Sequence, residues 1–232
     1  MIFAPSADNV LYGLNPNGQE IWQFESGEPL WAKPSVDSKC ECVYLSSMDH
    51  KVYALDAKSG GLIWSSDDLG GAIVDSPTNG DDNTLYVGTF NKELVALDSR
   101  NGRELWRFAT NDWVWASPAL EGDTLYFGDL SGTFYAVNRI TGVSKWQIQP
   151  GGAIVGTPLI TEDALIFGTE TGSLISVNKN GSIIWNQPYE TELLSGPISN
   201  GETILITTSD PETLLFAIDP GGVQKWSYKV SE

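Results

Sequence analysis

The residue types that most often carry chemistry are few in this chain, beginning with two cysteines. Cys40 and Cys42 flank Glu41 at the expected start of a strand. Side chains two positions apart on a strand share one face, so both thiols point the same way. A disulfide between them needs strained geometry, and a metal site needs more ligands than two thiols. We therefore expect two ordinary free thiols at a strand edge.

The single histidine and the paired acids are typical of turns rather than of catalysis. His50 has no nucleophile beside it, and a solvated turn histidine is the default interpretation. Calcium loops alternate oxygen ligands around a tight glycine turn. The acidic pairs do not have that pattern, and they are Asp67–Asp68, Asp81–Asp82 and Glu190 with Glu192. The sequence thus predicts no catalytic residue and no metal site.

A small aromatic set is the candidate for binding. It consists of Trp31, Trp113 and Trp115, together with Lys33 and Asp75. All lie in or beside the segments expected to form the innermost strands of the fold. Aromatic side chains at an accessible channel mouth anchor peptides or sugars. The alternative is that these rings fill the space between neighbouring sheets.

Composition narrows the function classes. The 232 residues are 41% hydrophobic, which supplies a sizeable core and excludes wholesale disorder. Thirty acidic and 13 basic residues give a net charge of −17, which disfavours binding to nucleic acid or to anionic lipid. No stretch approaches the ~18 apolar residues of a membrane span. Met1 to Pro5 has neither the basic region nor the apolar core of a secretory signal.

A repeat organises the whole chain. Six tryptophans recur every 39 to 42 residues, at positions 22, 64, 106, 146, 185 and 226. Each ends one phrase, which reads Ala54-Leu55-Asp56, then Gly60, then Trp64 in its fullest form. Gly102 and Gly142 occupy the position of Gly60 before Trp106 and Trp146. Asp or Asn followed by glycine is turn chemistry, and the alternating apolar residues on either side predict a β-hairpin.

Two further strands precede each hairpin. One is an alternating run such as Leu85 to Gly88; the other is an apolar segment that ends in proline. The five proline segments are 30–34, 73–77, 114–118, 154–158 and 193–197. Four short antiparallel strands in about 40 residues predict a blade of a β-propeller. A two-sheet sandwich is the rival fold.

The predicted fold is therefore all-β, with residues 1–232 forming a single propeller domain. The second, third and fourth strands occur six times, whereas the proline-bearing first strand occurs five times. We expect six blades, one of which lacks its innermost strand. The alternative is that this chain is part of a seven- or eight-bladed propeller.

The repeated phrase resembles the tryptophan-docking repeat of pyrroloquinoline quinone (PQQ)-like β-propellers. The resemblance implies that the outer-strand tryptophan packs on the neighbouring blade, which gives structural docking roles to Trp22, Trp64, Trp106, Trp146, Trp185, Trp226, Gly60, Gly102 and Gly142. The family includes quinoprotein dehydrogenases, lipoproteins of the outer-membrane assembly machinery and sensor domains of kinases. Because relatives are usually exported, it also implies a periplasmic or extracellular location.

The resemblance is nearer to the non-catalytic assembly propellers than to the dehydrogenases. The dehydrogenases hold PQQ with calcium under long inserted loops and carry a disulfide between adjacent cysteines. Here the loops are short and one residue separates Cys40 from Cys42. We expect a binding scaffold without cofactor, whose loops and channel mouth meet a protein or peptide partner, within a longer chain or complex. The alternatives are a PQQ-dependent dehydrogenase fragment and a polysaccharide-binding or sensor module.

Overall fold

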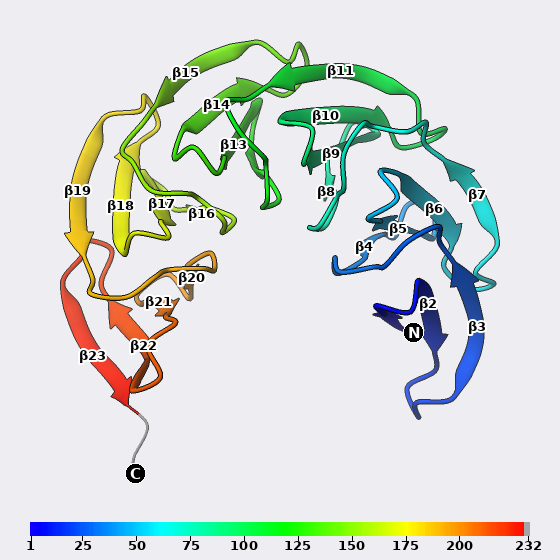
Figure 1. Ribbon diagram of the computed structural model, residues 1–232, viewed down its shortest axis with the longest axis horizontal. Helices are drawn as coiled ribbons and strands as arrows, with labels where there is room; N and C mark the ends of the chain where they lie inside the picture. The colour runs from blue at the N-terminus through cyan, green and yellow to red at the C-terminus, as the bar shows by residue number, and fades with distance from the viewer. Residues whose placement is uncertain (230–232) are drawn as a thin grey trace. The chain divides into compact units, whose positions relative to one another are not determined.

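The computed structural model describes residues 1–229, and every regular element in that range is a β-strand. None of the described segments is a helix long and apolar enough to cross a membrane. The chain divides into two compact units, Met1–Ser117 and a second that begins at Pro118. Each unit holds three antiparallel sheets formed by consecutive strands (Figure 1).

The first unit begins with a three-stranded sheet, as the repeat predicts. Its strands are β1 (Ile2–Pro5), β2 (Val10–Leu14) and β3 (Glu20–Glu25). Two four-stranded sheets follow: β4 (Ser35–Asp37), β5 (Cys42–Ser46), β6 (Val52–Asp56) and β7 (Leu62–Ser65), then β8 (Thr78–Asn79), β9 (Thr84–Thr89), β10 (Glu93–Asp98) and β11 (Glu104–Ala109).

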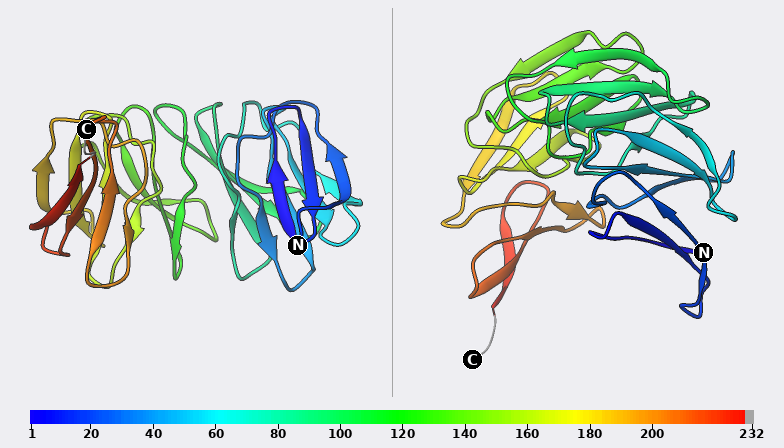
Figure 2. Two further views of the ribbon diagram at one scale, coloured as in Figure 1. Left: turned by 90° about the horizontal axis from the view of Figure 1, so that it is seen from below. Right: turned by 45° about the vertical axis from the view of Figure 1, so that its right-hand side comes forward.

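The second unit contains three four-stranded sheets, each an up-and-down meander whose turns gather at two opposite edges (Figure 2). The first has β12 (Ala119–Glu121), β13 (Thr124–Gly128), β14 (Phe134–Asn138) and β15 (Ser144–Ile148). The next has β16 (Leu159–Ile160), β17 (Ala164–Gly168), β18 (Ser173–Asn178) and β19 (Ile183–Pro188). The last has β20 (Ile198–Ser199), β21 (Ile204–Thr207), β22 (Thr213–Ile218) and β23 (Gln224–Lys229).

Hydrophobic cores lie between consecutive sheets of a unit. One cluster joins Val52 and Trp64 of one sheet to Leu85, Val95 and Leu97 of the next. Strand β5 is buried at all five of its residues, because its two faces pack against different neighbours. This explains why the second and third strands are buried at nearly every position, whereas the outer strands are exposed at many of theirs.

Every outer strand carries a bulge just before its tryptophan. In the second sheet, Ala54 pairs with Trp64 while Leu55 pairs with Leu62, so Ile63 is the extra residue. The register shifts at the same place in the other five sheets. A bulge increases the local twist and redirects the side chains that follow it, and it therefore sets where each indole points.

The innermost strands begin later than the sequence analysis expected. Residues 30–34, expected as a strand, form an irregular segment, and β4 starts at Ser35, directly after Pro34. The same shift occurs at β8, β12, β16 and β20, each of which follows its proline. Proline has no N–H for a ladder bond and restricts the residue before it. The buried aliphatic residue of each segment instead donates its N–H to the preceding sheet, as Leu30 does to the carbonyl of Ser6 at 3.2 Å.

Candidate functional site

A row of paired residues crosses each sheet and ends at its tryptophan. In the second sheet, Ser35 pairs with Tyr44, Tyr44 with Ala54 and Ala54 with Trp64. The ring centroids of Tyr44 and Trp64 lie 5.9 Å apart. The residue between them must be small, because the indole folds over it. In the first sheet that position is Gly13, where an added Cβ would lie 2.2 Å from Trp22.

Within each unit, these indoles lie on turn glycines of the next sheet. An added Cβ at Gly60 would be 2.5 Å from the ring of Trp22, and one at Gly102 would be 2.5 Å from the ring of Trp64. The second unit repeats this contact with Trp146 on Gly181 and Trp185 on Gly222. All four glycines have positive φ, between 71° and 88°, so the turn conformation and the close approach both favour glycine.

The same turns accept the indole N–H. Nε1 of Trp64 donates to the carbonyl oxygen of Ser99 at 2.9 Å, and Nε1 of Trp146 donates to that of Lys179 at 2.9 Å. In each case the acceptor follows the Asp or Asn that begins the turn. That Asp or Asn holds the turn by accepting backbone N–H groups, as Asp98 does from Arg100 at 2.9 Å. The tryptophan contact therefore combines ring packing with a buried hydrogen bond.

Asp98 is the most strongly held of these turn acids. The guanidinium of Arg100 contacts both of its carboxylate oxygens, at 2.9 and 2.7 Å. These hydrogen bonds lower the pKa of Asp98 to about 2. The carboxylate thus stays charged throughout the neutral range and holds the turn on which Trp64 rests.

The structure brings together several residues of the candidate binding set. Ser76 Oγ donates to the carbonyl oxygen of Lys33 at 2.6 Å, and Ser117 Oγ donates to that of Ser76 at 2.7 Å. Asp75 accepts the N–H of Ser117 through Oδ2 at 2.7 Å. Hydrogen bonds therefore join the segments that precede β4, β8 and β12. The carboxylate of Asp75 is engaged in this framework, while the side chain of Lys33 is exposed.

Two of the candidate tryptophans form an exposed aromatic cluster with Phe90, a residue that the sequence analysis missed. Phe90 stacks on Trp113, with ring centroids 4.5 Å apart, and lies 5.2 Å from Trp115. Trp113 is 40% exposed and Trp115 36%. In the sequence, Phe90 is distinguished only by being aromatic in the turn after β9. The equivalent position of the second sheet holds Met48. We refer to Phe90, Trp113 and Trp115 as the aromatic cluster.

Trp31 occupies the position of Trp115 on the segment before β4 and is 58% exposed. The intermediate sheet has the smaller Val74 at this position, and Val74 is buried. Large exposed apolar side chains that gather in one patch mark surfaces that meet a partner. The first unit thus presents indoles on two of its three equivalent segments.

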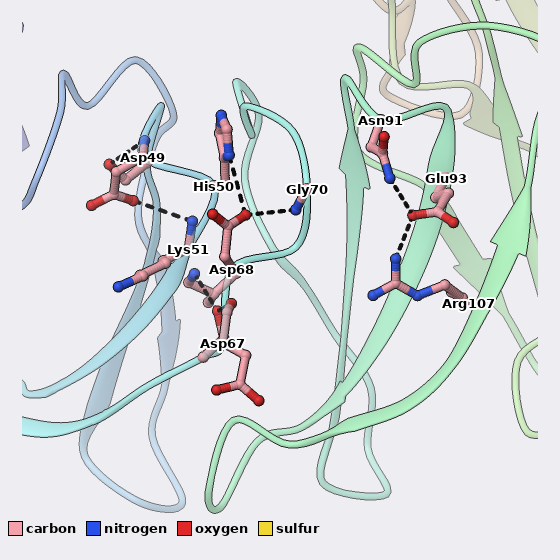
Figure 3. A network of polar contacts seen from close by, with 12 residues as sticks. Asp49, His50, Lys51, Asp67, Asp68, Gly70, Asn91, Glu93 and Arg107 are labelled. Atoms are coloured by element: carbon pink, nitrogen blue, oxygen red, sulfur yellow. Dashed lines mark hydrogen bonds and ion pairs between the residues drawn. The ribbon is translucent and has the colours of Figure 1, made fainter.

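Ion pairs occur at residues close in sequence to the aromatic cluster. Lys92 Nζ lies 3.2 Å from Asp112, the residue before Trp113. Arg107 pairs with Glu93 at 2.6 Å and with Glu104, and Asn91 donates to Glu93 at 3.0 Å (Figure 3). The pairing with Glu104 raises the pKa of Arg107. The charges of these groups are matched within the pairs.

His50, in the turn between β5 and β6, contacts Asp68, one member of the first acidic pair. Nδ1 of His50 lies 3.1 Å from Asp68, which also accepts the N–H of Gly70 at 2.7 Å (Figure 3). The bond from Gly70, followed by that from His50, lowers the pKa of Asp68. His50 lies in a turn with positive φ, as its alignment with Lys92 suggests. This arrangement fixes the loop 67–70 beside Asn91.

The expectation of free thiols is wrong: Cys40 and Cys42 form a disulfide. The prediction assumed that both residues lie on a strand, but β5 begins at Cys42. Glu41 has a φ of 53°, and this turn brings the two Cα atoms to 5.1 Å, which is within the usual disulfide range. Lys58 holds the turn through an ion pair with Glu41 at 2.6 Å.

No three His, Cys, Asp or Glu side chains among residues 1–229 gather as candidate metal ligands.

Comparisons with known proteins agree on the fold. Residues 7–151 and 149–232 match the family model described as "Outer membrane protein assembly factor BamB". The crystal structure of BamB from Moraxella catarrhalis superposes with a TM-score of 0.83 over 97% of this chain and 72% of that chain, at 19% identity. The present chain has the β-propeller fold predicted from its repeats.

A curated relative is the serine/threonine-protein kinase AfsK of Streptomyces coelicolor. It is 30% identical over 110 residues, which make up 47% of this chain and 12% of the kinase. The chain therefore spans about an eighth of the length of that relative.

Proposed function

Because the chain belongs to the family described as outer membrane protein assembly factor BamB, we propose that it is a non-catalytic scaffold that binds a protein or peptide partner. The observation that carries the proposal is the aromatic cluster. Two indoles remain more than one-third exposed although Phe90 lies between them. Such anchors are typical of the centre of a binding surface.

The framework supports recognition with little rearrangement. The segments that carry Trp31 and Trp115 are tied together through Ser76, whose bonds measure 2.6 and 2.7 Å. A preorganised surface loses less conformational entropy on binding than a mobile one. Lys33, whose side chain is exposed, is available for polar contact with a partner, whereas Asp75 holds the framework through its bond from Ser117.

We propose that the chain works without PQQ or calcium. Its cysteine pair encloses Glu41 and lies in a turn of the second sheet, unlike the adjacent cysteines of the quinoprotein dehydrogenases. Reconstitution with PQQ and calcium tests this directly. We expect no PQQ absorbance in the protein peak after gel filtration and no dye reduction with alcohols. Co-elution with turnover would establish the dehydrogenase alternative.

The proposed setting is outside the cytoplasm, in the periplasm or at the cell surface. The family description supports this location, and a disulfide is stable in an oxidising compartment. The likeness to a kinase supports a sensor module as the second candidate function.

Peptide display tests the binding proposal. A random peptide library is selected on the full chain, and binders are compared between wild type, Trp113→Ala and Trp115→Ala. We expect the affinity to fall about tenfold or more in both variants, as at interface hot spots. Leu62→Ala is the matched control, because Leu62 is also exposed but lies on an outer strand.

Binders with equal affinity for wild type and for both tryptophan variants would contradict the proposed site. Selection of no peptide, together with quenching of tryptophan fluorescence by glycans, would favour the polysaccharide-binding alternative.

A further inference from the structure

The second unit contains a cavity between its β16–β19 sheet and its β20–β23 sheet. The volume is about 840 Å³, within the range of small-molecule sites in proteins. One wall consists of residues 159–164 with Ser176 and Trp185, and the other includes Ser199 and Pro220. Both walls therefore belong to one unit, and the cavity has room for a small ligand.

The first unit shows what fills the equivalent groove elsewhere in the chain. Between its second and third sheets, a groove of about 390 Å³ is lined by Tyr44, Trp64 and Ser99 among others. Tyr44 is buried beside Trp64, with ring centroids 5.9 Å apart. Its hydroxyl donates to the carbonyl oxygen of Ser99 at 3.4 Å. A tyrosine ring and its phenol hydroxyl thus occupy the inner part of this smaller groove.

The cavity of the second unit lacks this tyrosine. Ile166 pairs with Ser176, and Ser176 pairs with Trp185, so Ile166 stands where Tyr44 stands in the second sheet. Ile166 has neither the ring nor the hydroxyl. An added Cβ at Gly222 would lie 3.1 Å from the ring of Trp185, compared with 2.5 Å at the corresponding glycine of the first unit. The larger cavity therefore follows from a shorter side chain and a more distant turn.

A buried hydroxyl in the cavity wall has no protein partner. Ser176 is 1% exposed and occupies the position of Ala54 in the second sheet. Its Oγ makes no hydrogen bond within the described part of the chain. Burying an unpaired hydroxyl costs free energy that an apolar alanine would not. A polar group of a ligand in the cavity would supply the partner that Ser176 lacks.

The charge of the cavity selects for cations. Glu162 and Asp163 are exposed in the turn between β16 and β17 and belong to the wall, and none of the described residues that line the cavity is Lys, Arg or His. The groove of the first unit differs, because Lys39 and Arg100 line it. The net charge of −17 adds to the attraction for a cation.

We propose that this cavity binds a phenol that carries an ammonium group, as in a small phenolic amine. The ring packs beside Trp185, in the space that a tyrosine fills in the second sheet. The phenol hydroxyl donates to the carbonyl oxygen of Pro220, the counterpart of Ser99, and accepts from Ser176 Oγ. The ammonium lies beside Glu162 and Asp163. This site goes beyond the scaffold function, since the aromatic cluster belongs to the first unit.

Ligand-observed NMR titrations of the full chain with three matched probes test the chemistry of the site. Tyramine has both the phenol and the ammonium, and we expect a dissociation constant of about 0.1–1 mM for so small a ligand. Phenethylamine lacks the hydroxyl and should bind about threefold more weakly. In 3-(4-hydroxyphenyl)propionate a carboxylate replaces the ammonium, so binding should weaken about tenfold or more beside the two acidic residues.

Three variants test the location of the site. Ile166→Tyr puts a tyrosine ring back into the cavity, as Tyr44 does in the second sheet, and should abolish tyramine binding. Glu162→Gln changes an exposed turn residue without disturbing the core, and should weaken tyramine binding about two- to fivefold. Glu170→Gln is its matched control, because Glu170 is an exposed turn glutamate outside the cavity wall. The control should bind tyramine like wild type.

A short peptide with an N-terminal tyrosine carries the same two groups and distinguishes their source. Binding of tyramine alone supports a free amine as the ligand, whereas equal binding of the peptide supports a peptide amino terminus. The absence of saturable tyramine binding up to about 10 mM would overturn the proposal. Equal affinity for the propionate probe, or tyramine binding that neither Ile166→Tyr nor Glu162→Gln weakens, would overturn it as well.

Discussion

The ring of Trp64 lies so close to Gly102 that a Cβ on this glycine would stand 2.5 Å from Cε3 of the indole. The two residues come from neighbouring sheets, and the indole N–H donates to Ser99 of the same turn. The contact therefore fixes the conformation of the turn and the packing of both sheets at one point.

Removing a covered indole should destabilise the protein strongly. Trp64→Ala and Trp146→Ala each delete a large ring together with its hydrogen bond, and we expect a loss of about 3–5 kcal/mol in unfolding free energy. Trp226→Ala is the control, since its ring is half exposed, and it should cost about 1 kcal/mol or less in dilute protein. Urea titrations followed by circular dichroism measure all three. Equal midpoints would refute the structural role.

Gly102 should tolerate alanine less well than another positive-φ glycine does. Gly122→Ala places alanine in a left-handed conformation without a steric clash, which costs about 1–2 kcal/mol. Gly102→Ala adds the collision with Trp64, and overpacking adds about 1–3 kcal/mol. Thermal melts of the two variants should therefore separate clearly. If Gly122→Ala melted at or below the temperature of Gly102→Ala, the close packing would not hold.

Acid should weaken the turn at Asp98. The pKa of its carboxyl in the folded state is about 2, below the ordinary value of about 3.9 in an unfolded chain. A lowered pKa contributes stability that is present above the unfolded value and is lost as pH falls toward the folded value. Asp98→Asn should therefore be less stable than wild type at neutral pH, and the difference should shrink between pH 4 and pH 2. A difference independent of pH would contradict this role.

The disulfide predicts a specific alkylation pattern. In denaturant without reductant, iodoacetamide should add to neither Cys40 nor Cys42, and after reduction it should add to both. Intact-mass spectrometry counts the adducts. Two adducts before reduction would restore the free thiols expected from the sequence.

Much of the fold could be predicted because the same strand and turn pattern, ending in tryptophan, occurs six times in the sequence. The turn phrase at Asp56 and Gly60 and the missing strand before β1 were readable from spacing alone. The start of β4 could not be predicted in this way. The apolar residues before Pro34 resemble a strand, but Pro34 has no N–H for a ladder hydrogen bond, and β4 begins only after it. The disulfide was missed because alternation along a strand says nothing about the left-handed Glu41.

The candidate site was predicted only in part. The sequence singled out Trp113 and Trp115, but their joint contact with Phe90 depends on how the β9–β10 turn meets the segment that follows β11 of the same sheet. Such contacts are set by tertiary packing and leave no periodic trace in the sequence.

The extra residue in each outer strand also constrains how this chain can vary. With Ile63 present, Trp64 pairs with Ala54 and faces the next sheet. Deleting Ile63 would leave Trp64 opposite Ala54 and on the same face, but it would remove the local twist by which the bulge aims the indole at the turn of the next sheet. Substituting Ile63 by another residue, or gaining or losing a whole blade of about 40 residues, keeps the indole in place. Substitution and duplication of entire blades are therefore the tolerated routes of divergence, and single-residue deletions in these strands are not.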